Sequence, residues 1–167
     1  CFSNVILSRS FNSIAQLYVF DCLILLLYLT LLNNKPLNLS NNLKIVNDPI
    51  YGFITIPSAL IFDLIEHPYF QRLRRISQMG MSYLVYPGAH HTRFHHALGA
   101  MFLMQKAVQV LRSKGIAISD KEQEALLVAI LLHDIGHGPF SHAMEHSIVE
   151  NISHEEISLL FMEELNT

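Results

Sequence analysis

The sequence lacks several features that would assign it to common protein classes. It has no tryptophan and only two cysteines in 167 residues, Cys1 and Cys22, both in the N-terminal stretch. This excludes a disulfide framework and a thiolate metal site. Basic residues are not in excess, because the formal net charge is −3 with neutral histidine, so specific nucleic-acid binding is not expected. The length suits one domain with a hydrophobic core.

Long apolar runs are confined to residues 14–32, IAQLYVFDCLILLLYLTLL, about the length that spans a bilayer. Asp21 lies near the middle, where an acidic residue costs roughly 2.5–3.5 kcal/mol on insertion scales. The stretch is too long for a signal peptide, and no small-residue cleavage site follows it. Two interpretations stay open: a native membrane anchor, or, slightly favoured, translated AT-rich DNA upstream of the true start.

The composition changes after a polar linker, NNKPLNLSNNL, at residues 33–43. We therefore divide the chain into residues 1–43, the apolar stretch and linker, and residues 44–167, a globular domain. We expect a cytoplasmic location, with membrane attachment only if residues 14–32 are a native anchor. The chain begins at Cys1 and stops at Thr167 just after an apparent helix, so we expect a fragment of a longer protein.

From Lys44 onward the sequence predicts an all-α fold with short extended segments near residues 49–56 and 83–86. A turn is expected at Asp48-Pro49, ahead of the first extended segment. Capping and stop signals place the helix boundaries. They predict helices at PSALIFDLIEH, from Pro68 to Gly80, from Thr92 to Lys114, from Ser119 to Gly136, from Pro139, and from Ser153.

Histidine is abundant instead, with ten residues that all lie at or after His67. In LLHDIGHGPFSH, residues 131–142, His133 and Asp134 follow an apolar run directly. A buried carboxylate requires a compensating cation. With His96 brought in from another helix, two imidazoles and one carboxylate converge. This donor set suits Mn, Fe or Zn, with Mg suitable if more oxygens join.

Two further residues suggest acid–base chemistry. His142 and Glu145 are three apart, so on a helix the carboxylate can orient the imidazole as a general acid. A surface contact is the usual role of such a pair taken alone. No functional role is assigned to the exposed or supporting histidines, which are His90, His91, His95 and His146.

Taken together, HTRFHHALG and LLHDIGHGPFSHAMEH resemble the HD-domain phosphohydrolases, named for their adjacent metal-binding His-Asp. The closer similarity is to the deoxynucleoside triphosphate triphosphohydrolase branch, and it extends from about Lys44 through KIVNDPIYG and FQRLRRISQMG. The resemblance implies an HD-domain helical bundle, of which residues 44–167 form the N-terminal part. It also implies metal-dependent hydrolysis of deoxynucleoside triphosphates to deoxynucleoside and triphosphate.

The resemblance also implies roles for individual residues. His96, His133 and Asp134 match the metal ligands, and a fourth, an aspartate, would lie beyond Thr167. The remaining matches are Arg93 and His137 for phosphate, Gln78 for the sugar, and His142 and His154 for catalysis. Glu145 stands where the animal relatives have an aspartate.

In regulated members, the segment equivalent to Glu66, Gln71 and Arg74 helps to bind an activator nucleotide between subunits. Here Glu66 replaces the usual aspartate. The alternative is an amphipathic helix whose arginines are solvated, and the two interpretations are equally supported. The resemblance further implies a homo-oligomer in the full-length protein.

Two alternative functions stay open. An HD phosphohydrolase could act on nucleoside monophosphates, cyclic nucleotides or another phosphoester, and only the triphosphohydrolase predicts inorganic triphosphate as a product. A non-catalytic nucleotide-binding regulatory module would bind nucleotide without turnover. The intact His96/His133/Asp134 set argues against the second alternative, because binding alone does not require open metal positions.

Overall fold

The computed structural model describes residues 44–140, 143 and 153–165. These residues all belong to the second of two units into which the chain divides, Pro36–Thr167. None of the helices described there is long and apolar enough to cross a membrane. The apolar stretch at residues 14–32, with its two open interpretations, lies outside the described residues. So do His142, Glu145 and most of the helix predicted to begin at Pro139.

A short hairpin opens the described chain, with β1 at Lys44–Asp48 paired antiparallel to β2 at Gly52–Ile56. The Asp48 carboxylate accepts hydrogen bonds from the backbone N–H groups of Ile50 and Tyr51, at 2.8 and 2.9 Å. The predicted turn at Asp48-Pro49 and the strand after it are therefore confirmed. The strand before the turn was not predicted.

The hairpin packs through an aromatic contact on α4, Arg93–Ser113, the longest helix that the structure describes. The rings of Tyr51 and Phe102 have centroids 5.2 Å apart. A Cβ atom at Gly99 would lie 2.9 Å from Cε2 of Tyr51, so the helix needs a glycine where this ring approaches. The glycine of HHALG therefore has a packing role.

Two short helices follow the hairpin. α2 spans Ala59–Glu66, and the side chain of Ser58 caps it by accepting from the Ile61 N–H at 3.3 Å. α3 spans Pro68–Gln71 and continues as a 3-10 turn, η1, at Arg72–Arg75. The prediction that α2 stops before Pro68 and that Pro68 begins the next helix is confirmed.

The prediction that this second helix continues to Gly80 is wrong. Beyond η1, the backbone pairs with the segment that leads into the next long helix instead of bonding along a helix. The Gln78 N–H donates to the His91 carbonyl at 3.1 Å, and the Arg93 N–H donates to the Ile76 carbonyl at 2.9 Å. This long-range pairing replaces the local helical bonds.

The prediction of an extended segment at residues 83–86 is also wrong. Residues Ser82–Leu84 form a 3-10 turn, η2. The Ser82 carbonyl accepts from the N–H groups of Val85 and Tyr86 at 3.0 and 2.8 Å, so the chain coils instead of extending. Leu84, Val85 and Tyr86 are each about two-thirds exposed or more, at 67%, 74% and 66%.

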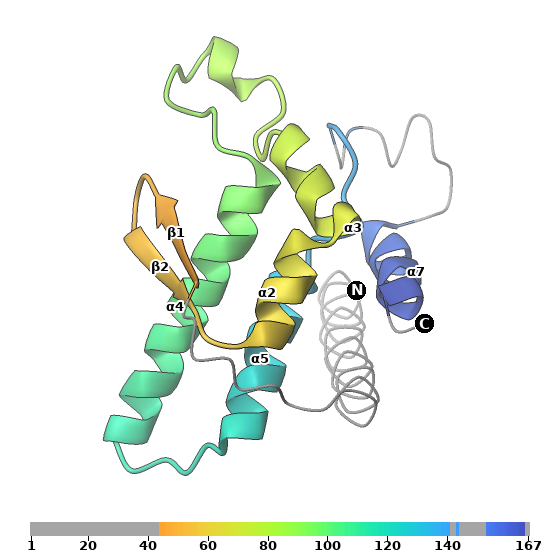
Figure 1. Ribbon diagram of the computed structural model, residues 1–167. Helices are drawn as coiled ribbons and strands as arrows, with labels where there is room; N and C mark the ends of the chain where they lie inside the picture. The colour runs from red at the N-terminus through yellow and green to blue at the C-terminus, as the bar shows by residue number, and fades with distance from the viewer. Residues whose placement is uncertain (1–43, 141–142, 144–152, 166–167) are drawn as a thin grey trace, which may run out of the picture. The chain divides into compact units, whose positions relative to one another are not determined.

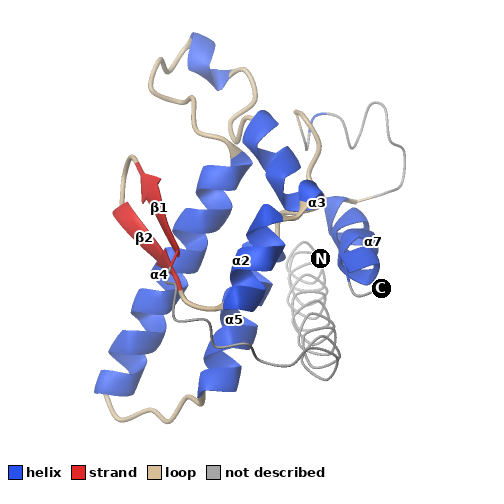
Figure 2. Cartoon of the chain, in the orientation of Figure 1, coloured by secondary structure: helices blue, strands red, loops and turns tan. Residues whose placement is uncertain are grey.

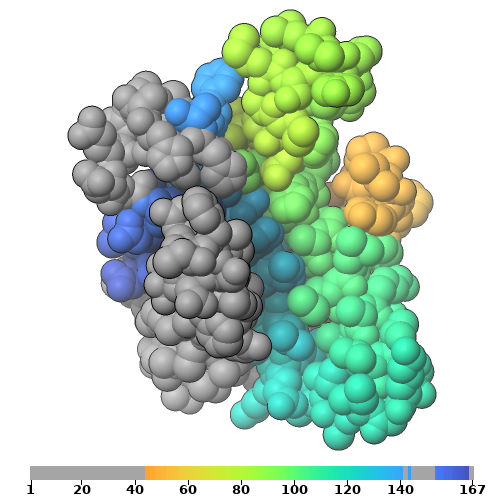
Figure 3. Space-filling model, turned by 180° about the vertical axis from the view of Figure 1, so that it is seen from behind, coloured from red at the N-terminus to blue at the C-terminus, as the bar shows by residue number. Residues whose placement is uncertain are grey.

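Two long helices, α4 at Arg93–Ser113 and α5 at Asp120–Leu132, pack against each other (Figures 1 and 2). Thr92 precedes α4 as predicted, and Gly115 follows it with φ 84°. Ser119 and Glu122 form the predicted capping box of α5. Much of α4 (green) lies at the surface in Figure 3.

α5 ends at Leu132, four residues earlier than predicted, and His133 is its C-cap. A turn follows, and the last described helix, α7, spans His154–Leu165. The cap predicted for α7 is confirmed, since the Ser153 N–H donates to the Glu156 carboxylate at 2.9 Å.

The described core consists of almost fully buried apolar side chains from β2, from the helical segments α2 to α5 and from the turn after α5. The largest are Ile54, Ile61, Ile65, Phe70, Leu73, Phe94, Leu98, Met101, Leu127, Leu131 and Ile135. The core continues along α5 into the turn that holds Asp134. The site is therefore built on the packed ends of α4 and α5, which confirms the all-α class with only a small sheet.

Candidate metal centre

The structure brings His96, His133 and Asp134 together from two helices. His96 lies in the first turns of α4, while His133 and Asp134 follow the last turn of α5. Their ligand atoms all lie within 4.8 Å of one another. Nε2 of His96 lies 3.6 Å from Oδ2 of Asp134, and Nε2 of His133 lies 3.3 Å from Oδ1.

The two shortest of these distances, 3.3 and 3.6 Å, are close to those expected around a shared divalent ion. Two ligand atoms that are each about 2.1 Å from one ion lie roughly 3.0–3.4 Å apart in octahedral or tetrahedral geometry. Nδ1 of His133 lies 2.6 Å from the Ile130 carbonyl oxygen, a contact that leaves Nε2 to face Asp134. A second hydrogen bond of this kind orients metal-binding imidazoles. The donor set therefore suits a first-row divalent ion.

Asp134 of the cluster also forms a buried ion pair with Arg93. Nη1 of Arg93 donates to Oδ2 of Asp134 at 2.8 Å. The two residues are only 4% and 9% exposed. Nε2 of His137 lies 3.4 Å from the other carboxylate oxygen. Asp134 is thus surrounded by one guanidinium and three imidazoles.

Asp134 is ionised in this environment. Burial alone would raise the pKa of the carboxyl group. The hydrogen bond with His137 and the charges that Arg93, His133 and His137 carry in the acidic range where a carboxyl group titrates outweigh it, and they hold the pKa of Asp134 well below its usual range. The carboxylate is therefore in the form that binds metal.

Two of the neighbouring imidazoles, those of His96 and His137, favour their neutral form. Burial lowers the pKa of His96 and of His137, and the Asp134 carboxylate only partly opposes this. Neutral imidazole is the ligand form of histidine. The site is therefore suited to bind a cation without first losing protons from these rings.

His137 and His154 form a second group beside the cluster. Their rings stack with centroids 3.9 Å apart and an angle of 13° between planes. His137 is 3% exposed and lies in the turn after α5, while His154 is the first residue of α7. The structure thus brings two of the predicted catalytic or phosphate-binding residues together.

The other candidate residues lie on the segment before α4. The backbone N–H of Gln78 donates a hydrogen bond to the carbonyl of His91, the residue before Thr92. The side-chain Oε1 of Gln78 is buried and has no hydrogen-bond partner among the residues that the structure describes. Nε2 of Gln71 donates to the Ile65 carbonyl at 2.7 Å. Its Oε1 accepts from Nε of Arg74, also at 2.7 Å.

Arg74 also lies over the Phe94 ring, with Cζ 3.6 Å from the ring centroid. This cation–π contact joins η1 to the start of α4. Glu66, the third residue of the predicted activator site, is exposed at the end of α2. Within the predicted set, the structure therefore joins Gln71 to Arg74.

Comparison with known proteins shows which family this part of the chain is similar to. The family model described as the HD domain matches residues 93–166. A crystallised phosphohydrolase from Bacteroides thetaiotaomicron is 59% identical, with a TM-score of 0.72, over 75% of this chain and 31% of that one. Residues 93–166 of this chain therefore match the HD domain. The match begins at Arg93 and includes the whole His96/His133/Asp134 cluster.

Curated relatives agree with this assignment. Deoxynucleoside triphosphate triphosphohydrolase SAMHD1 from Homo sapiens is 39% identical over 133 residues, which cover 75% of this chain and 21% of the relative. The uncharacterized protein YwfO from Bacillus subtilis is 42% identical over 115 residues, covering 69% and 26%. The chain thus spans about a quarter of the length of these relatives.

Two residues that shape the HD site were missed by the sequence analysis. Arg72 donates through Nη1 to the His137 carbonyl at 3.1 Å and through Nη2 to the Ile135 carbonyl. Ser158 of α7 accepts from the Gly136 N–H at 2.8 Å. The partners of Arg72 are 65 and 63 residues away in sequence, so no local pattern signals them.

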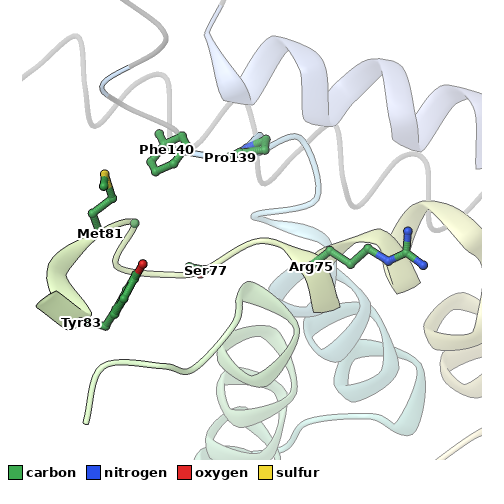
Figure 4. A pocket seen from close by; sticks show the side chains of 7 residues that line it. Arg75, Ser77, Met81, Tyr83, Pro139 and Phe140 are labelled. Carbon is green, nitrogen blue, oxygen red and sulfur yellow. The ribbon is translucent and has the colours of Figure 1, made fainter. Parts of the chain in front are cut away.

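A hollow of about 250 Å³ lies beside Pro139 and Phe140, the residues that follow the turn holding Asp134 and His137 (Figure 4). Pro139 and Phe140 continue the chain from His137 into its wall. The full lining consists of Arg75, Ser77, Gly80, Met81, Tyr83, Pro139 and Phe140. None of these lining residues belongs to the predicted site, so we assign the hollow no role.

Proposed function

We propose that this HD domain forms the metal-binding part of a nucleotide phosphohydrolase that releases inorganic triphosphate from deoxynucleoside triphosphates. The observation that carries the proposal is the convergence of His96, His133 and Asp134 at the end of a buried helix. The substrate is proposed from the 39% identity to the triphosphohydrolase of Homo sapiens.

The cluster supplies the metal chemistry in this proposal. A divalent ion held by His96, His133 and Asp134 would act as a Lewis acid toward a phosphate ester. Arg93 fixes the Asp134 carboxylate at 2.8 Å and brings a guanidinium next to the same position. Guanidinium groups bind phosphate oxygens with directional hydrogen bonds, so we propose that Arg93 also contacts the substrate phosphates.

We propose that the stacked histidines handle phosphate and protons. His137 is held against the Asp134 carboxylate and under the His154 ring, which leaves it little freedom to turn. A fixed imidazole is suited to bind a phosphate oxygen or to transfer a proton. We assign proton donation to the leaving 5′-oxygen to His142, oriented by Glu145, on the basis of the family resemblance.

The reaction product tests this proposal. The protein is incubated with Mn²⁺ and a deoxynucleoside triphosphate, and phosphorus NMR identifies the released species. We expect inorganic triphosphate, lost on chelation and in Asp134→Asn but retained in Asp120→Asn. Asp120 is a matched control because its side chain is 99% exposed at the other end of α5.

Hydrolysis that is undiminished by chelation or by Asp134→Asn would overturn the proposal. A second candidate is hydrolysis of a different phosphoester. It is favoured by the Bacteroides thetaiotaomicron structure, which is 59% identical and is described only as a phosphohydrolase. Release of monophosphate from another ester, with intact deoxynucleoside triphosphates, would favour this candidate.

A further inference from the structure

We infer that Arg72 is a positioning residue for the metal centre. Its guanidinium holds the carbonyl oxygens of Ile135 and His137, and so fixes the turn that carries Asp134. The inference rests on the metal-binding part of the proposed function. Arg72 comes from η1, whereas the metal ligands come from α4 and α5.

The turn after α5 lacks the regular support of a helix. α5 ends at Leu132, and the N–H groups of Ile135 and His137 bond back to Leu132 and Asp134 at 3.0 and 3.2 Å. The carbonyl oxygens of Ile135 and His137 accept hydrogen bonds from the guanidinium of Arg72. One side chain therefore holds the backbone on both sides of Gly136.

The guanidinium is itself held in place. Cζ of Arg72 lies 4.8 Å from the centroid of the Phe161 ring on α7. Burial lowers the pKa of Arg72, yet a guanidinium stays protonated in proteins. A charged donor on a stacked, half-buried side chain makes stronger hydrogen bonds than a neutral donor at the surface. Arg72 is thus built to hold a fixed position.

Ser158 of α7 also supports the turn after α5. Its Oγ accepts from the Gly136 N–H at 2.8 Å and lies 3.5 Å from the His133 carbonyl oxygen. Arg72 and Ser158 together engage four of the five backbone positions from His133 to His137, all except Asp134. Asp134 is therefore the residue whose placement depends on both contacts.

The shape of the guanidinium is essential to this role. Two carbonyls are reached by two separate donors in a rigid planar fork, which a lysine ammonium cannot reproduce. Arg72→Lys keeps the charge but loses this geometry. Substitution of a residue that orients the metal ligands without binding the metal itself typically lowers metal affinity by roughly 10- to 100-fold.

The experiment compares metal binding in two arginine variants, without nucleotide. Apparent Kd for Mn²⁺ is measured by calorimetry, and the visible spectrum of the Co²⁺ form reports ligand geometry. For Arg72→Lys we expect Kd to rise roughly 10-fold or more, with a changed Co²⁺ spectrum. Arg112→Lys is the matched control, because Arg112 also holds a backbone carbonyl, that of Ile118 at 2.9 Å.

Arg112 lies at the end of α4 remote in the chain from His96, so its variant should lose stability without changing Kd or the spectrum. A second variant, Phe161→Leu, keeps the guanidinium but removes the ring beneath it. It should raise Kd in the same direction by a smaller factor. Wild-type Kd and spectrum in Arg72→Lys would overturn the inference.

The readout separates this inference from the proposed function. A wild-type protein that binds Mn²⁺ but hydrolyses no nucleotide would contradict the proposed function alone. Unchanged metal binding in Arg72→Lys, in a protein that does hydrolyse nucleotide, would contradict the positioning role alone. If Arg72→Lys does not fold, Phe161→Leu alone decides the matter, and an unchanged Kd there overturns the inference.

Discussion

At the scale of single residues, Asp134 is the centre of the site. It contacts Arg93, His96, His133 and His137 within 3.6 Å, and it is 9% exposed. A carboxylate this deeply buried is tolerated because of these cations and donors. Without a metal, Arg93 is the closest cationic partner, so the pair belongs to the stability of the protein as well as to its chemistry.

Removal of Asp134 should therefore destabilise the metal-free protein. Asp134→Ala leaves the buried Arg93 guanidinium without its carboxylate, and the free energy of unfolding should fall by roughly 3–5 kcal/mol. Urea unfolding in the presence of a chelator measures it. Asp120→Ala breaks an exposed pair with Arg112 and should cost at most about 1 kcal/mol. Equal losses in the two variants would contradict this account of the buried pair.

The residue scale also shows where sequence prediction works. His133 and Asp134 stand out because two polar residues follow an apolar helical stripe, and His96 because of its place in HTRFHHALG. Arg72 does not stand out, because FQRLRR looks like an ordinary amphipathic helix. Its role depends on carbonyls 63 and 65 residues away, which only the packed structure brings near.

At the scale of elements, the decisive contact is between the turn after α5 and the start of α7. A Cβ atom at Gly136 would lie 2.3 Å from the His154 carbonyl oxygen and 2.4 Å from the Ser158 nitrogen. These are backbone atoms of α7, so they cannot move aside cheaply. The glycine permits the close approach that brings His154 onto His137.

Gly136→Ala should accordingly be costly. The added methyl group pushes α7 away from the turn, and we expect a loss of roughly 1–3 kcal/mol or more in the free energy of unfolding. Gly138→Ala is the matched control, since a Cβ atom there meets nothing within 4 Å and φ is not in the left-handed region. Its effect should stay within about 0.5 kcal/mol. Urea unfolding of both variants provides the test, and a tolerated Gly136→Ala would contradict the packing argument.

Element boundaries were predictable where the signal is local. The capping pairs Ser119–Glu122 and Ser153–Glu156 lie within one helical turn, and both form as expected. Two predictions were wrong: the helix from Pro68 was expected to reach Gly80 but ends with η1 at Arg75, and the extended segment expected at residues 83–86 is replaced by the 3-10 turn η2 at Ser82–Leu84. The first depends on pairing with the residues before α4, and the second on a run of consecutive exposed apolar residues that imitates a strand.

At the scale of the whole molecule, the buried His137 and the partly buried His96 link stability to pH. Burial lowers the pKa of His96 and His137 from an ordinary value of 6.5. The unfolded chain therefore binds more protons than the folded one once the pH falls below about 6.5. Stability is fully present above that pH and is lost as the pH falls toward the lowered pKa of the folded state.

We therefore expect the metal-free protein to be less stable at pH 5.5 than at pH 7.5, as measured by the urea midpoint. His90→Asn should show the same pH dependence, because His90 is exposed and lies outside the cluster. His96→Asn should show a weaker one. A midpoint that is equal at the two pH values in wild-type protein would contradict the assigned environment of these histidines.

The all-α class could be predicted from the sequence because helical periodicity and caps are repeated along most of residues 59–165. The route by which α7 returns to the turn after α5 could not, since residue spacing says nothing about which helices pack. The candidate metal ligands were predictable because two histidines and an aspartate, residue types with known metal chemistry, stand in a recognisable pattern. The backbone groups that hold them carry no such signal.

Metal titration of chelator-stripped protein tests the central claim most directly. Calorimetry with Mn²⁺ should show one ion bound per chain in wild-type protein and in the exposed control His90→Ala. Binding should be lost, or weakened by roughly 100-fold or more, in His96→Ala, His133→Ala and Asp134→Ala, because each removes a ligand. Wild-type affinity in all three ligand variants, or no ion bound by the wild-type protein, would contradict the account.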